Sequence, residues 1–157
     1  MSAPRIRPAR PEDADACARV LTASITALCD ADHRGDPAVI ARWVANKTPE
    51  GVARMIAAGG VRVAELDGRI AAVGEVDKEE GKITLNYVDP PCRRRGLSSA
   101  LLAAMEVELA RSGIRTARLT ATATAREFYL RHGWSPVGPG RAGRWIVGYP
   151  MHKPLAP

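Results

Sequence analysis

The stretch of sequence that decides the fold lies between Pro90 and Ala100 and reads PPCRRRGLSSA. It places three arginines and a glycine where a predicted strand gives way to a predicted helix. A helix N-terminus carries partial positive charge and unpaired N–H groups, so each arginine there costs about 0.3–1 kcal/mol unless an anion binds beside it. Gly96 lets the backbone approach such an anion, and Ser98 and Ser99 can donate hydroxyl hydrogen bonds. The pattern predicts a phosphate-binding loop, with a solvated basic loop as the alternative.

The residues on either side of this loop predict a strand before it and a helix after it. The strand, Lys82–Val88, is rich in β-branched and aromatic residues and ends at the prolines. The helix starts at Leu97 and carries apolar residues at helical spacing as far as Ser112, after which Gly113 can cap it. A further strand at 114–121, a helix at 124–132 and closing strands at 134–137 and 144–151 follow.

The first half of the chain predicts helices followed by antiparallel strands. After a short opening strand at 6–9, helical stretches are predicted at 11–28, from Pro37 through Val44, and from Thr48 to Gly59. From Val61 the apolar period changes to two, and Asp67-Gly68 predicts a hairpin leading into a strand at Arg69–Asp77. This order of elements implies a mixed sheet with at least one parallel pair. Ligands of such sheets bind at the carboxyl ends of the parallel strands.

A second motif follows the loop, from Thr124 to Trp134, and reads TAREFYLRHGW. It is similar to Asn-Ala-x-x-Phe-Tyr-x-x-x-Gly-Phe of the GNAT superfamily of N-acetyltransferases, with threonine where asparagine is common. The pyrophosphate loop of that family reads Arg/Gln-x-x-Gly-x-Gly/Ala, and Arg93 to Ser98 matches it with a serine at the last position. The two motifs, in this order, make the chain resemble the family over essentially its whole length.

The resemblance implies the architecture and the domain organisation. It predicts an α/β fold with a central mixed, mostly antiparallel sheet that splays into a V between its fourth and fifth strands. Helices cover both faces, and acetyl-coenzyme A lies in the opening. A length of 157 residues fits one such domain, so residues 1–157 are predicted to form a single GNAT-like domain.

The resemblance also implies the roles of individual residues. Backbone N–H groups of the loop hold the pyrophosphate, and a main-chain N–H near Val88 polarises the thioester carbonyl. Tyr129 matches the tyrosine that protonates the departing thiolate, with a packed, locally bonded tyrosine as the alternative. Thr124 either contacts the coenzyme or serves more simply as a helix N-cap. The predicted cofactor-binding residues are Val88, Arg93, Arg94, Arg95, Gly96, Leu97, Ser98, Ser99 and Thr124.

The base that accepts the proton of the amine is predicted less directly. An amine must be neutral before it attacks, and a carboxylate that is buried or acts through water can take its proton. Glu75 is the preferred candidate, because an acid among the apolar neighbours of a predicted strand is unusual. Alternation along the strand places it equally well on a solvated face. Asp77 and Glu65 are the weaker substitutes.

Composition and charge exclude several other classes of function. A net charge of +6 suits a polyanion such as a nucleic acid, a lipid surface or a phosphorylated cofactor. Three cysteines without a CxxC pair, and three histidines without ligand spacing, predict no metal site and no disulfide framework. No apolar run approaches the roughly 20 residues of a membrane span, so no membrane partner is expected. A reducing cytoplasm fits these features.

The sequence therefore predicts an N-acetyltransferase that moves an acetyl group from acetyl-coenzyme A to a primary amine by direct attack in a ternary complex. A catalytically weak acyl-coenzyme A sensor or regulatory module is the alternative. A small nucleic-acid-binding domain ranks third, because interleaved aromatic residues and a recognition helix are missing. The acceptor is a small molecule or a peptide, for which Trp43 and Trp145 can line a pocket by analogy with the family. A homodimer is possible.

Overall fold

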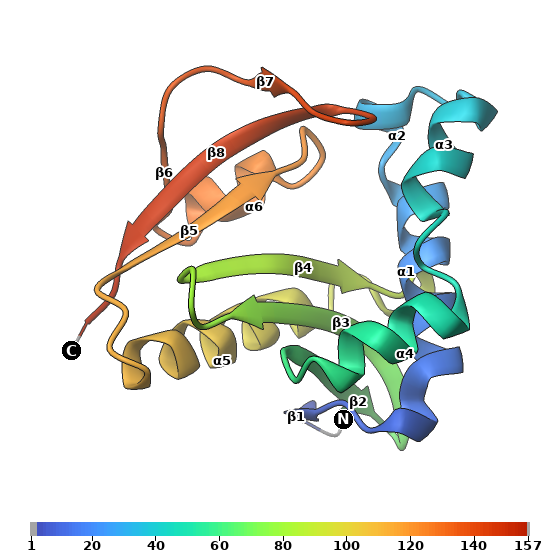
Figure 1. Ribbon diagram of the computed structural model, residues 1–157, viewed down its shortest axis with the longest axis horizontal. Helices are drawn as coiled ribbons and strands as arrows, with labels where there is room; N and C mark the ends of the chain where they lie inside the picture. The colour runs from blue at the N-terminus through green and yellow to red at the C-terminus, as the bar shows by residue number, and fades with distance from the viewer. Residues whose placement is uncertain (1–2, 157) are drawn as a thin grey trace.

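A computed structural model describes residues 3–156, which form an eight-stranded sheet with helices on both of its faces (Figure 1). The helices are α1 (Ala14–Leu28), α2 (Asp30–His33), α3 (Pro37–Val44), α4 (Pro49–Ala57), α5 (Leu97–Arg111) and α6 (Arg126–Arg131), with 3-10 turns η1 (Pro11–Asp13) and η2 (Pro90–Cys92). The strands are β1 (Arg5–Pro8), β2 (Val61–Leu66), β3 (Arg69–Asp77), β4 (Lys82–Val88), β5 (Thr116–Ala121), β6 (Ser135–Pro136), β7 (Arg141–Ala142) and β8 (Val147–Pro154).

The strand order is β1-β2-β3-β4-β5-β8-β6, with β7 paired to β8. Neighbouring strands run antiparallel except β4 and β5, which are parallel. This confirms the predicted mixed, mostly antiparallel sheet. The predicted bounds of β3 and β4 agree with the structure residue for residue, because turn residues punctuate both ends of each strand.

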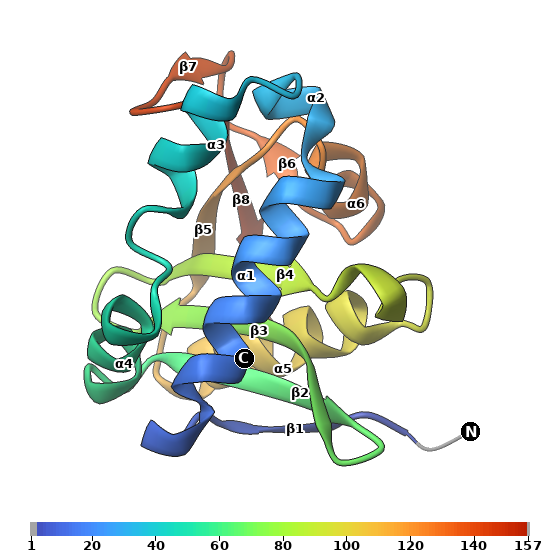
Figure 2. The same cartoon turned by 90° about the vertical axis from the view of Figure 1, so that its right-hand side faces the viewer.

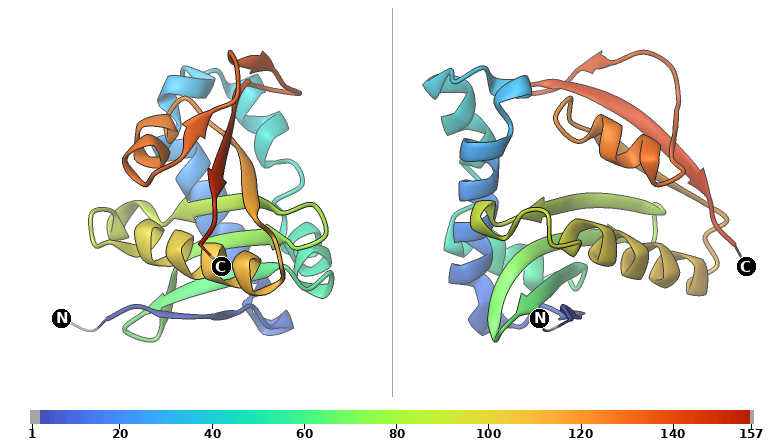
Figure 3. Two further views of the ribbon diagram at one scale, coloured as in Figure 1. Left: turned by 90° about the vertical axis from the view of Figure 1, so that its left-hand side faces the viewer. Right: turned by 180° about the vertical axis from the view of Figure 1, so that it is seen from behind.

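The parallel strands β4 and β5 separate almost as soon as they meet. Their only paired register position among the described residues is Lys82 with Arg118, at the start of both strands. Beyond it β4 stays with β3, and β5 stays with β8, so the sheet opens into two arms (Figures 1 and 3). The predicted V between the fourth and fifth strands is confirmed.

A β-bulge lies on β4 next to this opening. Glu75 of β3 is opposite Leu85, but the next residue, Val76, is opposite Ile83, so Thr84 is the extra residue on β4. A bulge reverses the alternation of side chains along the bulged strand. Accordingly, Ile83 belongs to the core beneath α5, whereas Leu85 packs on the opposite face.

Two hydrophobic cores lie on the two faces of the sheet. On one face α1 and α4 pack on β2 and β3, and on the other α5 packs on β3 and β4 (Figure 2). Gly74 of β3 allows α5 to come close, because a Cβ there would lie 2.8 Å from Sδ of Met105. The helix α6 extends this second core onto the arm formed by β5 and β8.

The structure contains two short elements that the sequence patterns do not predict. The segment 29–36, between two predicted helices, contains α2, at whose end the buried His33 accepts a hydrogen bond from Gly35 N at Nδ1 and donates from Nε2 to the Ile25 carbonyl. The loop before the last strand contains the additional strand β7, which pairs with β8 in a tight hairpin.

A charged network fixes the first strand to the start of α1. The Arg7 guanidinium bonds both carboxylate oxygens of Asp13, at 2.8 and 3.1 Å, and Oε1 of Glu65 at 2.8 Å. Asp13 also accepts a hydrogen bond from Arg10 N at 2.7 Å. Hydrogen bonding to Arg7 holds the pKa of Asp13 below its usual range. The network stabilises the ionised carboxylate in a largely buried place.

Replacing this carboxylate tests the network. Asp13→Asn is expected to lower the free energy of unfolding at pH 7 by about 2 kcal/mol, because charge-assisted hydrogen bonds are lost. Because the pKa of Asp13 is lowered, its contribution to the free energy of unfolding is fully present above about pH 4 and is lost as the pH falls further. The free energy of unfolding of the variant should therefore fall less steeply in acid than that of the wild type. Urea unfolding between pH 3 and pH 7 measures both effects. Glu12→Gln, in the same turn but exposed, is the control and should change stability little.

Candidate functional site

The loop between β4 and α5 presents unpaired backbone N–H groups. Arg94 and Gly96 both have left-handed backbone conformations, with φ of 65° and 76°. Within residues 3–156 no side chain caps the N-terminus of α5. A Cβ built on Gly96 would meet no atom within 4 Å, so the space before the helix is open. An exposed, uncapped N-terminus of a 15-residue helix, with arginine side chains beside it, is suited to bind a phosphate group.

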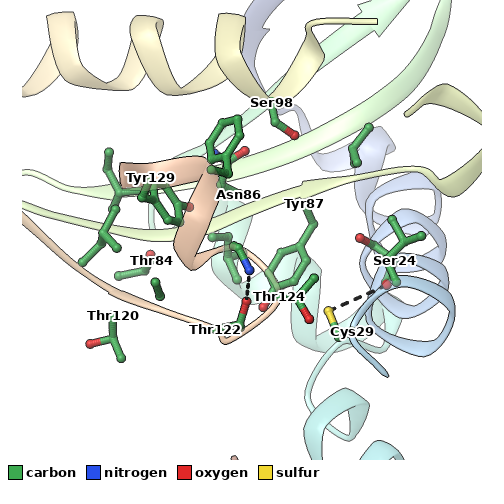
Figure 4. A pocket seen from close by; sticks show the side chains of 18 of the residues that line it. Ser24, Cys29, Thr84, Asn86, Tyr87, Ser98, Thr120, Thr122, Thr124 and Tyr129 are labelled. Carbon is green, nitrogen blue, oxygen red and sulfur yellow. Dashed lines mark hydrogen bonds between the residues drawn. The ribbon is translucent and has the colours of Figure 1, made fainter. Parts of the chain in front are cut away.

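A cavity of about 310 Å³ extends from this loop into the V (Figure 4). Its walls come from α1, β4, the start of α5, β5 and α6, so both arms of the sheet contribute. The lining residues with polar side chains are Ser24, Cys29, Thr84, Asn86, Tyr87, Arg93, Ser98, Thr120, Thr122, Thr124 and Tyr129. Val88, at the carboxyl end of β4, lines the same cavity. Leu97 is buried, so only its backbone faces the loop.

Tyr129, the predicted proton donor, lies on α6 with only 6% of its surface exposed. Burial raises the pKa of Tyr129 to about 12, and the Asn86 side chain acts against this shift. Its hydroxyl therefore stays protonated at neutral pH, which a proton donor requires.

Asn86 is a site residue that the sequence analysis missed. Its Oδ1 is buried and has no hydrogen-bond partner among residues 3–156. An unpaired buried oxygen costs about 1–3 kcal/mol, so its position in a cavity wall calls for a ligand that donates a hydrogen bond. The signal was present in the sequence, because Asn86 interrupts the apolar run Leu85-Asn86-Tyr87-Val88.

The structure gives Ser99 and Thr124 partners within the protein. Nδ1 of His132 lies 2.6 Å from the Phe128 carbonyl and must donate to it, so Nε2 accepts from the Ser99 hydroxyl at 2.9 Å. The expectation that this hydroxyl faces a phosphate therefore does not match its contact in the structure. Thr124 lines the cavity but does not cap α6, because its hydroxyl donates to Asp32 at 2.6 Å.

The three candidate bases lie outside the cavity wall. Glu75 accepts a hydrogen bond from the Thr84 hydroxyl at 2.7 Å and lines a separate groove on β3, where Asp77 also lies. Among the residues that the structure describes, only Thr84 is shared between this groove and the cavity. Asp77 accepts hydrogen bonds from two backbone N–H groups of the following turn, and Glu65 is paired with Arg7. None of the described residues lining the cavity is Asp, Glu or His.

Asp32 joins the two arms across the opening, and the sequence did not reveal this role. Its carboxylate accepts hydrogen bonds from Ala123 N at 2.7 Å, Thr124 N at 3.1 Å and the Thr124 hydroxyl at 2.6 Å. Asp32 belongs to α2, which follows the helix on the first arm, whereas Ala123 and Thr124 connect β5 to α6 on the second. This carboxylate is therefore a strut that fixes the separation of the cavity walls.

The comparisons with known proteins agree with this geometry. A family described as an acetyltransferase (GNAT) domain matches residues 29–155, which include both the loop and Tyr129, so the chain belongs to the GNAT acetyltransferase family. A search of curated protein sequences finds no match.

Solved structures share the fold over the full length of the described chain. The GCN5-related N-acetyltransferase "Aminotransferase, Class-II" from Rhodopseudomonas palustris is 25% identical, with a TM-score of 0.88 over 99% of this chain and 98% of that one. The PaiA N-acetyltransferase from Thermoplasma acidophilum, determined in complex with coenzyme A, is 16% identical, with a TM-score of 0.77 over 98% and 100%. Ard1 from Thermoplasma volcanium is 19% identical, with a TM-score of 0.75 over 99% and 100%.

The described residues contain neither a metal-binding cluster nor a membrane-spanning helix. In residues 3–156 no group of three or more His, Cys, Asp or Glu residues could hold a metal ion. No helix in that range is long and apolar enough to cross a membrane.

The strut can be tested with a double-mutant cycle. Asp32→Ala is expected to lower the free energy of unfolding by about 2 kcal/mol, because a carboxylate with three hydrogen bonds is removed. Thr124→Val should cost less, since the two backbone donors keep their partner. Because both changes break one shared hydrogen bond, urea unfolding of the double variant should show a coupling energy of about 1 kcal/mol. Strictly additive losses would mean that the two residues do not act together.

Proposed function

We propose that the protein is an acetyl-coenzyme A-dependent N-acetyltransferase that transfers the acetyl group by direct attack of an amine in a ternary complex. One observation carries the proposal: the uncapped N-terminus of α5 opens into the same cavity that holds the buried hydroxyl of Tyr129 and the unpaired Oδ1 of Asn86. The chain thus combines an anion site, a proton donor and an unsatisfied acceptor in one space that extends between the arms of the V.

The residues present fit coenzyme A. The open space before Gly96 leaves room for a pyrophosphate, and backbone N–H groups of Arg94 to Ser98 would hold it. The exposed side chains of Arg93, Arg94 and Arg95 add charge-assisted hydrogen bonds. When bound, acetyl-coenzyme A supplies the activated acyl group as a thioester.

The chemical roles fall to residues of the cavity wall. A main-chain N–H at the end of β4, near Val88, polarises the thioester carbonyl and stabilises the oxyanion. The Tyr129 hydroxyl donates its proton to the departing sulfur. Asn86 lines the same cavity, and its side chain acts against the rise in the pKa of this hydroxyl.

Glu75 is retained as the proton acceptor for the amine, acting through Thr84. The Thr84 hydroxyl lines the cavity and already donates to Glu75, so a proton taken up at its oxygen, directly or by way of water, can pass to the carboxylate. The single-domain organisation over 1–157, a small-molecule or peptide amine as acceptor, a homodimer and a cytoplasmic location belong to the same proposal.

A second candidate is a catalytically weak acyl-coenzyme A sensor. The absence of a carboxylate or histidine from the described cavity wall favours it, since no base lies in direct reach of a bound amine. The two functions share the cofactor site and differ in turnover. Acetyl transfer to any amine at a rate that depends on Tyr129 would exclude the sensor.

Binding of the cofactor is the first test. At 100 times its dissociation constant, acetyl-coenzyme A should add about 2.7 kcal/mol of stability, and at roughly 2–4 °C per kcal/mol the melting temperature should rise by several degrees. Duplex DNA should give no rise in melting temperature. Dephospho-coenzyme A keeps the pyrophosphate and should therefore still raise the melting temperature.

A matched variant distinguishes a loss of anion binding from a general loss of stability. Ser98→Asp adds a carboxylate to the first turn of α5, which suits the helix dipole and should preserve or raise the melting temperature of the free protein. The same charge repels a pyrophosphate, so the rise with acetyl-coenzyme A should be lost. An undiminished rise in this variant would remove the loop from the binding site.

The proton donor is tested by kinetics. Tyr129→Phe is expected to lower kcat roughly 100-fold while leaving the acetyl-coenzyme A melting shift unchanged, because a general acid acts only in the transition state. Since the Asn86 side chain acts on the pKa of the same hydroxyl, the variant Asn86→Leu should slow turnover on its own but add little to Tyr129→Phe. Tyr149→Phe, on β8 outside the cavity, is the control. Equal kcat in wild type and Tyr129→Phe would assign this residue to packing.

A further inference from the structure

A nearly buried ammonium group lies outside the proposed reaction centre. Lys47, in the linker between α3 and α4, is only 7% exposed. Its Nζ donates to the neutral Oδ1 of Asn46 at 2.9 Å and lies 5.7 Å from the centre of the Trp145 ring. No carboxylate lies within 4.0 Å of Nζ among residues 3–156. An ammonium group has three N–H donors, so among these residues two are left without a hydrogen-bond partner and none has a partner of opposite charge.

This arrangement is unfavourable for the protein alone. Burying a cation without a paired anion costs several kcal/mol, and a cation–π contact offsets only part of that cost. Desolvation lowers the pKa of Lys47, while the negative charge of Glu75 acts against this shift. Glu75 is not its ion-pair partner, because it lies beyond salt-bridge distance and accepts a hydrogen bond from Thr84. Lys47 therefore lacks an anion.

The position of Lys47 connects it to the cavity. The ring of Trp145, 5.7 Å from Nζ of Lys47, packs against a buried cluster that includes Cys29. Cys29 lines the cavity that contains Tyr129. Trp145 comes from the connection between β7 and β8, on the other arm of the sheet. The contact between Lys47 and Trp145 thus joins the two sides of the V, at the end of the molecule where α3 and β7 lie (Figure 2).

We propose that the acceptor is an amine that also carries a carboxylate, that Lys47 and Asn46 bind this carboxylate, and that the amine faces Thr84 and Glu75. This inference rests on the proposed function and specifies its substrate class. Asn46 Oδ1 accepts from Lys47, so its exposed amide nitrogen remains a donor beside the ammonium group, and together they match the two oxygens of a carboxylate.

The charges favour a zwitterion over other ligands. One cation and one nearby anion, Lys47 and Glu75, complement a molecule with one carboxylate and one ammonium group. A phosphate would bring a second negative charge close to Glu75 without a second cation to balance it. A simple alkylamine would satisfy Glu75 and leave Lys47 buried without an anion.

The experiment compares pairs of acceptors in which one member has the carboxylate and the other a neutral carboxamide. Acetyl transfer is measured for L-α-amino acids, β-alanine and 4-aminobutyrate, each beside the analogue in which a carboxamide replaces the carboxylate. In at least one series the wild-type kcat/KM should favour the carboxylate about 10-fold or more. Lys47→Met should abolish that preference, mainly through a higher KM, and Lys47→Arg should restore part of it. Arg42→Met, an exposed basic residue of α3, removes the same net charge and should keep the preference.

Two results would overturn the proposal. One is a wild-type enzyme that acetylates amines but shows no preference for a carboxylate in any series, or acetylates none of these acceptors while binding acetyl-coenzyme A. The other is an unchanged preference in Lys47→Met. The acetyl-coenzyme A melting shift is recorded for every variant, and its retention in Lys47→Met shows an intact fold and cofactor site. A wild-type protein without that shift would overturn the proposed function itself, and the acceptor with it.

Discussion

The interrupted pairing of β4 and β5 is the constraint on which the rest of the structure depends. Two parallel strands that share one register position leave backbone N–H and carbonyl groups without ladder partners along the remainder of both inner edges. The bulge at Thr84 bends β4 at this place and directs Asn86 toward α6. The open edge, the helix N-terminus and the buried hydroxyl of Tyr129 thereby face one space. A ligand with amide groups along its length suits these unpaired edges.

Much of this arrangement could be predicted from the sequence because its signals are local. Glycines and prolines mark the ends of β3, β4 and α5, and the loop before α5 combines charge, glycine and hydroxyl groups within a few residues. The motif around Tyr129 is equally continuous. Where a function is carried by neighbours in the chain, residue type and spacing are enough to place it.

The remaining features depend on contacts that no local pattern contains. Asp32 and Thr124 are separated by 92 positions, and the ring of Trp145 reaches Lys47 only after both arms are in place. The bulge changes which face each residue of β4 occupies, so strict alternation could not place the partners of Glu75. The local pattern offers the Ser99 hydroxyl to a phosphate, because its partner His132 lies 33 positions away, directly after α6.

The Asp32 strut also has a thermodynamic consequence. It ties the helical layer that adjoins Lys47 to the connection that carries Thr124 and the start of α6, so two walls of the cavity share one carboxylate. Free-energy coupling between two sites is reciprocal: whatever factor one bound substrate contributes to the affinity of the other, it receives in return. Because one side chain holds both walls, a ligand that displaces one wall would change the affinity of the other wall for its own ligand, by the same factor whichever of the two binds first.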